Sequence, residues 1–129
     1  MEARATRLYT KDHTWVLITE MRARVGISDF AQKELGEIAY VELPKPGRRL
    51  SRGEAACTVD SMKTSSEVYS PLSGTVVRVN STVETEENCG LINSDPLERG
   101  WLFELEIVNS SELDFLLTEK DYFAFVQGN

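Results

Sequence analysis

Apolar residues recur at every second position in several short stretches of the first 108 residues. Between positions 101 and 108, for example, Trp101, Phe103, Leu105 and Ile107 are separated by single residues, two of which are glutamates. A repeat of two is the spacing of side chains on one face of a β-strand. This alternation, together with shorter β-prone runs bounded by turn residues, predicts strands over 15–19, 23–27, 38–43, 55–60, 67–69, 75–80 and 101–108.

Turn residues separate these stretches at short and regular intervals. Pro44, Pro46 and Gly47 end one predicted strand, Gly53 marks a second turn, and the run Pro71-Leu72-Ser73-Gly74 marks a third. Many short strands at turn spacings of roughly 8–12 residues are typical of a β-sandwich or a flattened barrel.

Two segments have a helical pattern instead. Ser28 is a favourable N-cap, Asp29 places an acid in the first turn, and Gly36 can end the helix, so we predict a two-turn helix over 28–36. Beyond Ser110, apolar residues return at helical spacing, which predicts one helix or two short ones over about 110–126. The expected fold class is therefore mainly β with peripheral helices.

The composition fits one globular domain. The chain has 129 residues, of which 41% are apolar and 27% charged, so we expect a single domain over 1–129 with its core at about 8–108. The longest apolar runs have four or five residues, too few for a membrane span, and 1–8 lacks the apolar stretch of a secretory signal. We expect a soluble protein.

Counting residue types excludes many functions. The net charge, 14 minus 21 or −7, argues against binding to nucleic acid or an anionic membrane. His13 is the only histidine and the two cysteines are far apart, so we expect no metal site, and no glycines have the spacing of a phosphate loop. A nucleophilic pair of His13 with Cys57 or Cys89 is formally possible. Cys57, however, lies in an alternating run that predicts a buried position. We therefore expect reduced thiols, a packing role for His13 and no catalytic side chain.

Lys63 is the most informative residue. It is one of five lysines and the only one between positions 46 and 119, and it lies between two predicted strands among small and hydroxyl side chains. This position predicts a primary amine at the tip of a hairpin. From this residue alone an ordinary solvated lysine is the default interpretation. An exposed and uncrowded amine is also what an enzyme that acylates lysine requires.

The residues around Lys63 resemble the attachment loop of the lipoyl and biotinyl carrier family. In that family a lysine at a hairpin tip is followed by a short strand and a Pro-x-Ser-Gly turn, here 71–74. Other motifs, in order from about Leu8 to Val126, are similar to those of the H protein family of the glycine cleavage system. They are Tyr9-Thr10-Lys11-Asp12-His13, Val25-Gly26-Ile27-Ser28-Asp29-Phe30-Ala31-Gln32, Leu35-Gly36-Glu37-Ile38, Val41-Glu42-Leu43-Pro44 and Asn93-Ser94-Asp95-Pro96 with Gly100-Trp101-Leu102.

The resemblance implies a barrel-sandwich hybrid fold and a carrier that is not itself an enzyme. Lys63 would hold lipoic acid in amide linkage. The lipoyl disulfide would accept an aminomethyl group from a pyridoxal-phosphate glycine decarboxylase. A tetrahydrofolate-dependent aminomethyltransferase would then take up the one-carbon unit, and dihydrolipoyl dehydrogenase would reoxidise the resulting dithiol. Lipoyl-attaching enzymes would be further partners. We expect a monomer, in the mitochondrial matrix if the source is eukaryotic and otherwise in the cytoplasm.

Two sets of residues follow from the resemblance. For recognition of the attachment loop they are Asp60, Ser61, Met62, Thr64 and Glu67, and for a cleft that shelters the loaded arm they are Asp12, His13, Thr14 and Glu67. The family commonly has glutamate after the histidine, where this chain has Thr14. We therefore expect charge pairing with the aminomethyl amine to fall on Glu67, and the loaded arm to be less well sheltered.

Two other functions stay open. Family loops often have valine before the lysine and alanine after it, whereas this chain has Met62 and Thr64, and a methionine before the lysine is a feature of biotin carriers. A biotinyl carrier would not explain the N-terminal motif, the Asn-Ser-Asp-Pro segment or the C-terminal helices. An H-like protein that relays lipoyl groups or regulates other enzymes would use the same loop.

Overall fold

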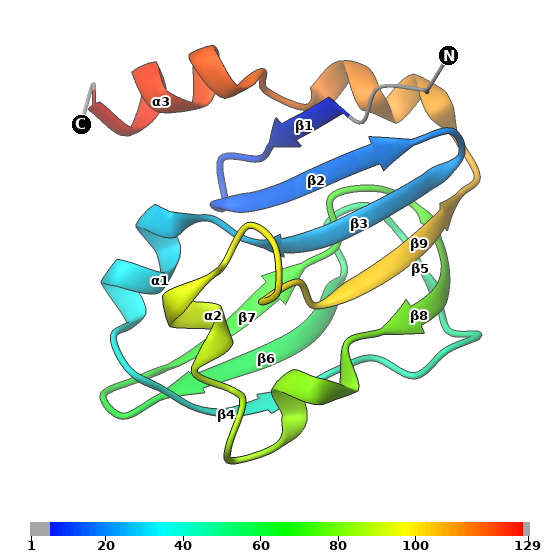
Figure 1. The fold of residues 1–129 in the computed structure, drawn as a ribbon. Helices are drawn as coiled ribbons and strands as arrows, with labels where there is room; N and C mark the ends of the chain where they lie inside the picture. The colour runs from blue at the N-terminus through cyan, green and yellow to red at the C-terminus, as the bar shows by residue number, and fades with distance from the viewer. Residues whose placement is uncertain (1–5, 128–129) are drawn as a thin grey trace, which may run out of the picture.

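Two antiparallel sheets face each other in the computed structural model, which describes residues 6–127 (Figure 1). The larger sheet has the strand order β1-β2-β3-β9-β8-β5, and the smaller has the order β4-β6-β7. Their bounds are β1 Thr6–Tyr9, β2 Thr14–Thr19, β3 Arg22–Ile27, β4 Ile38–Glu42, β5 Arg49–Leu50, β6 Ala55–Ser61, β7 Ser65–Tyr69, β8 Gly74–Val79 and β9 Phe103–Ile107. The predicted mainly β fold with peripheral helices is confirmed. Most of the stretch in which no secretory signal was expected, residues 1–5, lies outside the described residues.

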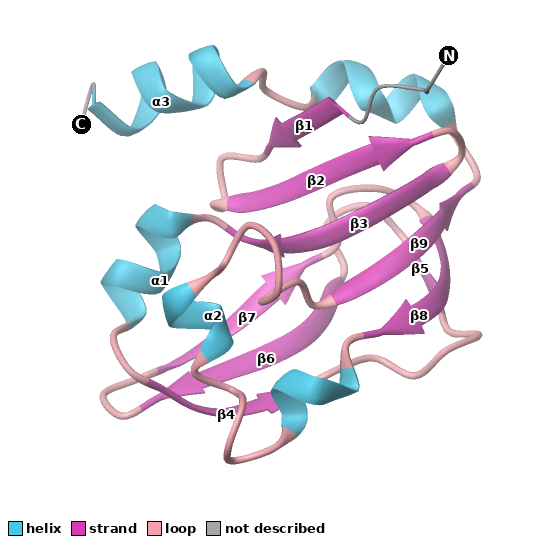
Figure 2. Cartoon of the chain, in the orientation of Figure 1, coloured by secondary structure: helices cyan, strands magenta, loops and turns pink. Residues whose placement is uncertain are grey.

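The helices lie around the periphery of the two sheets (Figure 2). They are α1 (Asp29–Leu35), α2 (Leu91–Ser94) and α3 (Glu119–Gln127), with 3-10 helices over Ser81–Glu84 and Ser110–Phe115. In α1 the Ser28 hydroxyl accepts a hydrogen bond from the Ala31 amide, and Gly36 closes the helix at a φ of +81°. The C-terminal segment contains two short helices, one of the two predicted arrangements.

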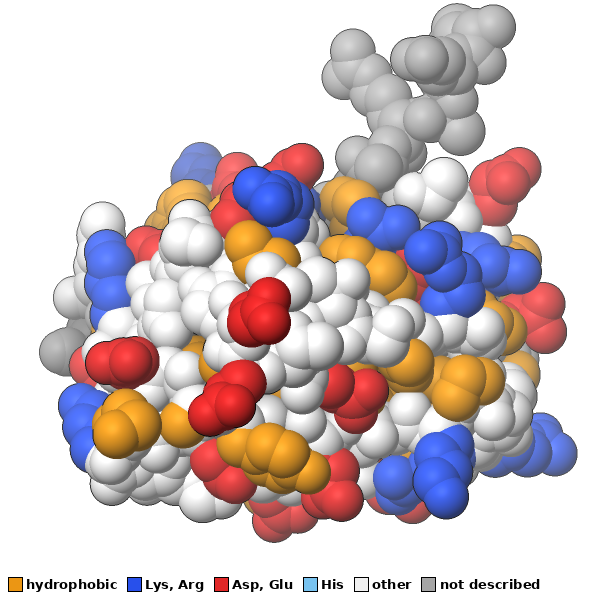
Figure 3. Space-filling model, turned by 60° about the horizontal axis from the view of Figure 1, so that its bottom comes forward, with side chains coloured by type: hydrophobic (Ala, Val, Ile, Leu, Met, Phe, Trp, Pro, Cys, Tyr) orange, Lys and Arg blue, Asp and Glu red, His pale blue; other side chains and the backbone are white. Residues whose placement is uncertain are grey.

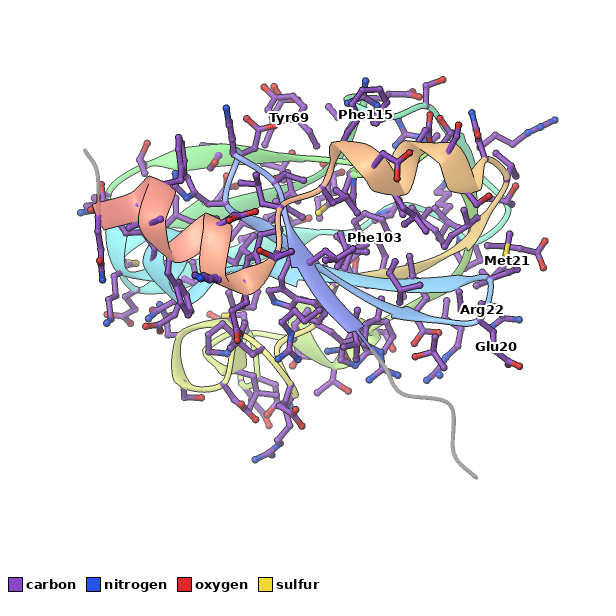
Figure 4. The ribbon with its side chains drawn as sticks, turned by 90° about the horizontal axis from the view of Figure 1, so that it is seen from above. Glu20, Met21, Arg22, Tyr69, Phe103 and Phe115 are labelled. Carbon is purple, nitrogen blue, oxygen red and sulfur yellow. The ribbon has the colours of Figure 1, made fainter. Side chains whose placement is uncertain are left out.

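The main core fills the space between the sheets. Val16, Val25 and Leu105 of the larger sheet and Val41 and Val59 of the smaller one are fully or almost fully buried. Figure 4 shows Phe103 among the strands, and the β2–β3 turn with its exposed Met21 at the opposite end of the molecule from α3. Burial of one face of each strand explains the alternation seen in the sequence.

A second cluster of aromatic residues attaches α3 to the outer face of the larger sheet. It contains Tyr9, Trp15, Trp101 and Tyr122. The rings of Tyr9 and Tyr122 stack at 4.4 Å, and the backbones of Tyr9 and Leu117 exchange two hydrogen bonds of 2.7 and 2.8 Å. The C-terminal segment is therefore packed firmly on β1 and β2.

The structure departs from simple alternation in β4 and β9. A register shift between Ile38 and Tyr40 lets Ile38 share the core with Val41, although their spacing of three would put them on opposite faces of a regular strand. In β9, Glu104 is only 7% exposed because Arg24 pairs with it at 2.7 Å and Arg78 lies at 3.7 Å. Strands β1 and β5 were not predicted, since the pairing that defines such short strands is not visible in their own residues.

The surface carries many charges of both signs. On the face shown in Figure 3, acidic side chains lie both near the centre and along the edges, whereas basic ones lie mainly towards the edges. No helix within residues 6–127 combines the length and the apolar character needed to cross a membrane.

Gly26 allows a close contact that tests this packing. A Cβ at position 26 would lie 2.5–2.7 Å from three atoms of the Trp15 indole, whose Nε1 donates to the Pro96 carbonyl at 2.9 Å. Gly26→Ala should therefore lower the free energy of unfolding by about 1–3 kcal/mol through overpacking, measured by urea denaturation. The control is Gly90→Ala, because no atom lies within 4 Å of that Cβ and φ is −65°. Equal midpoints for the two variants would contradict this account.

Candidate functional site

Lys63 lies at the tip of the β6–β7 hairpin, and its side chain is exposed. The turn is closed by Ser61, whose amide donates to the Thr64 carbonyl at 2.7 Å. The Ser61 hydroxyl oxygen also accepts from the amides of Lys63 and Thr64 at 3.2 and 3.1 Å. These bonds hold the backbone around Lys63 in one conformation while its amine stays in solvent.

The neighbours of Lys63 divide into residues that support the hairpin and residues that face solvent. Asp60 accepts a hydrogen bond from the Ser65 hydroxyl across the hairpin. The Met62 amide donates to the Glu37 carbonyl at 2.8 Å, which ties the hairpin to the segment between α1 and β4. The side chain of Met62 is 72% exposed, and that of Thr64 is exposed as well. Met62 and Thr64 are therefore accessible to an enzyme that approaches the amine.

The stem of Lys63 passes over the C-terminal end of α1. Its Cε lies 3.4 Å and its Cδ 3.9 Å from the position that a Cβ on Gly36 would occupy. The φ of +81° at Gly36 also favours a residue without a side chain. A glycine here leaves an open path for the lysine stem, and this path fits a long group attached at Nζ.

Asn93 fastens the segment on which the Lys63 stem rests. Its amide nitrogen donates to the Gln32 side-chain oxygen at 3.0 Å and to the Gly36 carbonyl at 2.9 Å. Its amide oxygen accepts from the Ile38 amide at 2.9 Å. The Asn-Ser-Asp-Pro segment thus contributes the residue that fixes the α1–β4 connection.

A cleft of about 160 Å³ lies between α1, β7 and the β1–β2 turn. It brings together Asp12, His13, Thr14 and Glu67, the four residues that the resemblance assigned to an arm cleft. The complete lining is Asp12, His13, Thr14, Ile27, Phe30, Ala31, Glu34, Leu35, Ser66, Glu67 and Val68. Thr14 is only 1% exposed, so it belongs to a wall of the cleft and not to its rim.

Glu34 was missed by sequence reasoning. It lies on α1, four residues after Phe30, and both residues line the cleft. Residues spaced by four share one helix face, which is a signal present in the sequence. The sequence does not show that this face meets β7 and the turn containing His13. With Asp12 and Glu67, Glu34 gives the cleft three carboxylates.

His13 packs between α1 and α3. Its φ of +67° is unusual for a residue with a side chain, and its ring lies 4.6 Å from that of Phe30. Nδ1 lies 2.7 Å from the hydroxyl of Tyr122. Burial lowers the pKa of His13 below its ordinary value, although the negative charges of Asp12 and Glu34 act in the opposite direction. The ring is therefore neutral at pH 7.5.

The two cysteines are buried and not bonded to each other. Burial raises the pKa of the Cys57 thiol to about 12, so it is not a thiolate at neutral pH. The Cys89 thiol donates to the Ile38 carbonyl at 3.4 Å, and neither cysteine lines the cleft with His13. This arrangement does not support a Cys–His nucleophile.

Known proteins share both the sequence and the fold of this chain. The family model described as "Glycine cleavage H-protein" matches residues 7–129. The glycine cleavage system H protein of Thermotoga maritima is 46% identical over 117 residues, covering 91% of this chain and 93% of that protein. The H protein of Xanthobacter autotrophicus is 48% identical over 118 residues, covering 92% and 93%.

A solved structure agrees with these relatives. The crystal structure of a glycine cleavage system H protein from Mycobacterium marinum is 32% identical in sequence, and it superposes with a TM-score of 0.81 over 98% of this chain and 99% of that one. The hairpin lysine, the ordered motifs and the fold agree with a single assignment: this chain belongs to the H protein family of the glycine cleavage system, whose members are its lipoyl carriers.

Proposed function

We propose that this chain carries a lipoyl group in amide linkage on Nζ of Lys63 and presents it in turn to the enzymes of glycine cleavage. The observation that carries the proposal is the fixed hairpin tip with its exposed amine, whose stem lies across Gly36. When bound, the lipoyl group supplies a disulfide that can take up an aminomethyl group and be regenerated by oxidation. The chain itself contributes attachment, shelter and docking, and no catalytic side chain.

The length of the arm matches the position of the cleft. Glu67 of β7 follows Lys63 by four residues, and four residues span at most about 14 Å even when fully extended, so Glu67 lies within that distance of the hairpin tip. A lysine with a lipoyl chain extends roughly 14 Å, about as far as four extended residues. The stem passes Gly36, and Leu35 and Glu34 follow on the cleft wall. The arm can therefore lie in the cleft or swing out to a partner.

The cleft has the charge that an amine requires. Asp12, Glu34 and Glu67 supply carboxylates, and His13 is neutral at pH 7.5 and adds no opposing positive charge. Ile27, Leu35 and other apolar side chains line the same space and displace water. Because Glu34 supplies a carboxylate in the same cleft, we propose that it compensates in part for Thr14.

The proposed partners are the glycine decarboxylase, the aminomethyltransferase, dihydrolipoyl dehydrogenase and the lipoyl-attaching enzymes. A single domain over 1–129 acting as a monomer, in the matrix or cytoplasm according to its source, remains part of the proposal. A biotinyl carrier is the second candidate, favoured by the exposed Met62 beside the lysine.

Intact mass distinguishes the two modifications. Protein isolated from its own host should carry one lipoyl addition, which differs from a biotinyl addition by tens of daltons, and Lys63→Arg should carry none because arginine cannot form the amide. Lys45→Arg is the matched control and should keep the addition, since Lys45 lies outside the hairpin. An unmodified Lys63 in a host competent for lipoylation would contradict the proposal.

Glycine-dependent exchange of carbon dioxide distinguishes a shuttle from a relay protein. The fully lipoylated chain, added to the glycine decarboxylase, should support this exchange. With the Lys63→Arg chain in its place, exchange should stay at the background rate. Absence of exchange with a fully lipoylated sample would favour the relay or regulatory alternative.

The carboxylates of the cleft can be tested on the aminomethyl-loaded chain by measuring spontaneous release of formaldehyde and ammonia. Glu34→Gln should speed release about two- to fivefold, the effect expected from losing up to about 1 kcal/mol of a partly exposed charge pair. Thr14→Glu should slow release by adding a carboxylate to the wall. Glu37→Gln, an equal charge change outside the cleft lining, should leave the rate unchanged. Equal rates for Thr14 and Thr14→Glu would contradict weaker shelter in this chain.

A further inference from the structure

The hydroxyl of Tyr122 connects three parts of the fold beside the cleft. It lies 2.7 Å from Nδ1 of His13 in the β1–β2 turn and 2.8 Å from the hydroxyl of Ser28 at the start of α1. Tyr122 itself is on α3 and is 1% exposed, and Ser28 is 2% exposed. Because Tyr122 and Ser28 are buried, each donor and acceptor of their hydroxyls needs a hydrogen-bond partner.

One arrangement of protons satisfies the whole chain. The Ser28 oxygen already accepts from the Ala31 amide at 3.1 Å, so its own proton needs an acceptor. Tyr122 is the other hydrogen-bond partner of this hydroxyl within the part of the chain that is described. Ser28 therefore donates to Tyr122, and Tyr122 donates to Nδ1 of His13. The reverse order leaves the buried Ser28 proton without an acceptor, at a cost of about 1–3 kcal/mol.

This arrangement determines which nitrogen of His13 carries the proton. A neutral imidazole has one donor and one acceptor nitrogen, so an accepting Nδ1 requires a proton on Nε2. The structure, over residues 6–127, places no hydrogen-bond partner on Nε2. His13 lines the cleft, and Nε2–H is the remaining hydrogen-bonding group of its ring.

The charged and titratable groups around the ring come from each element packed against it. Asp12 precedes it in the turn, Glu34 projects from α1, Glu67 of β7 lines the same cleft, and Tyr122 approaches from α3. The Lys11 Nζ lies 5.7 Å from the ring centroid of Phe125. The ring centroids of Phe125 and His13 are 6.1 Å apart.

We propose that Tyr122 is a positioning residue of the arm cleft, holding His13 as the neutral tautomer with its proton on Nε2. His13 then offers a donor to an acceptor such as a carbonyl oxygen or a sulfur, while the carboxylates Asp12, Glu34 and Glu67 bind a cation. The identity of the occupant rests on the proposed function. The tautomer and its dependence on Tyr122 do not.

Tyr122 also connects the cleft to a larger cavity. Tyr122 and Ser28 line a hollow of about 470 Å³ together with Phe123 and Val126 of α3, and Phe30 lines both this hollow and the cleft. The hydrogen bond from Tyr122 to His13 therefore crosses the wall between the two spaces.

The sole histidine of the chain makes a direct test possible. Imidazole ¹⁵N NMR of the full-length, unmodified protein at pH 8 should show protonated Nε2, unprotonated Nδ1 and a single tautomer. Tyr122→Phe keeps an aromatic ring to stack on Tyr9 but removes the hydroxyl. In this variant the spectrum should lose the single-tautomer pattern and shift towards the mixture of a solvated imidazole.

Tyr9→Phe is the matched control, because it removes the other hydroxyl of the stacked pair, whose partner is Glu119 at 3.5 Å. Its His13 spectrum should equal that of the unaltered chain. A proton on Nδ1 in the unaltered chain would overturn the proposal even if Tyr122→Phe failed to fold, and an unchanged tautomer in a folded Tyr122→Phe would also overturn it. Neither result bears on the proposal that Lys63 carries the lipoyl group, since the sample carries no modification.

Discussion

The amide side chain of Asn93 makes the connections on which the site depends. Its three hydrogen bonds fix the segment from Gly36 to Ile38. The Glu37 carbonyl of this segment accepts a hydrogen bond from the Met62 amide and so holds the Lys63 hairpin. Lys63, the proposed attachment residue, therefore rests on a backbone segment that Asn93 holds through three part-buried hydrogen bonds. Removal of one partner from such a set leaves the others unpaired, which costs more than the net strength of one bond.

A rigid support and a mobile amine have opposite requirements, and the hairpin meets them with different atoms. Ser61 restrains the backbone of Lys63 through its hydroxyl, while the lysine amine lies in solvent. The absence of a side chain at Gly36 leaves the stem room to lie down towards the cleft. A lipoyl carrier benefits from this division, because a lysine at the hairpin tip is presented in one way while its side chain can still move.

The acidic character of the chain is distributed between structure and function. Glu104 is nearly buried beside Arg24 and Arg78, whose guanidinium groups lie 4.6 and 5.3 Å from the ring of Trp101. Glu112 accepts hydrogen bonds from the amide and hydroxyl of Ser73. These carboxylates stabilise contacts between segments. The carboxylates of Asp12, Glu34 and Glu67 line the cleft instead, where we propose that they bind a cationic group, so net charge alone would not separate the two roles.

The sequence by itself determined seven of the nine strands, the capped helix at Ser28 and Gly36, and the exposed lysine, because alternation, capping and turn chemistry are local properties of the chain. Its motifs also indicated the family and, through that resemblance, predicted that Asp12, His13, Thr14 and Glu67 line a cleft. Only the tertiary structure brought Glu34 into their cleft and placed Tyr122 against His13, 109 positions away. It also revealed the shift in β4 that buries Ile38. These features depend on which faces of the sheets and helices pack against each other, and a local sequence pattern does not specify those contacts.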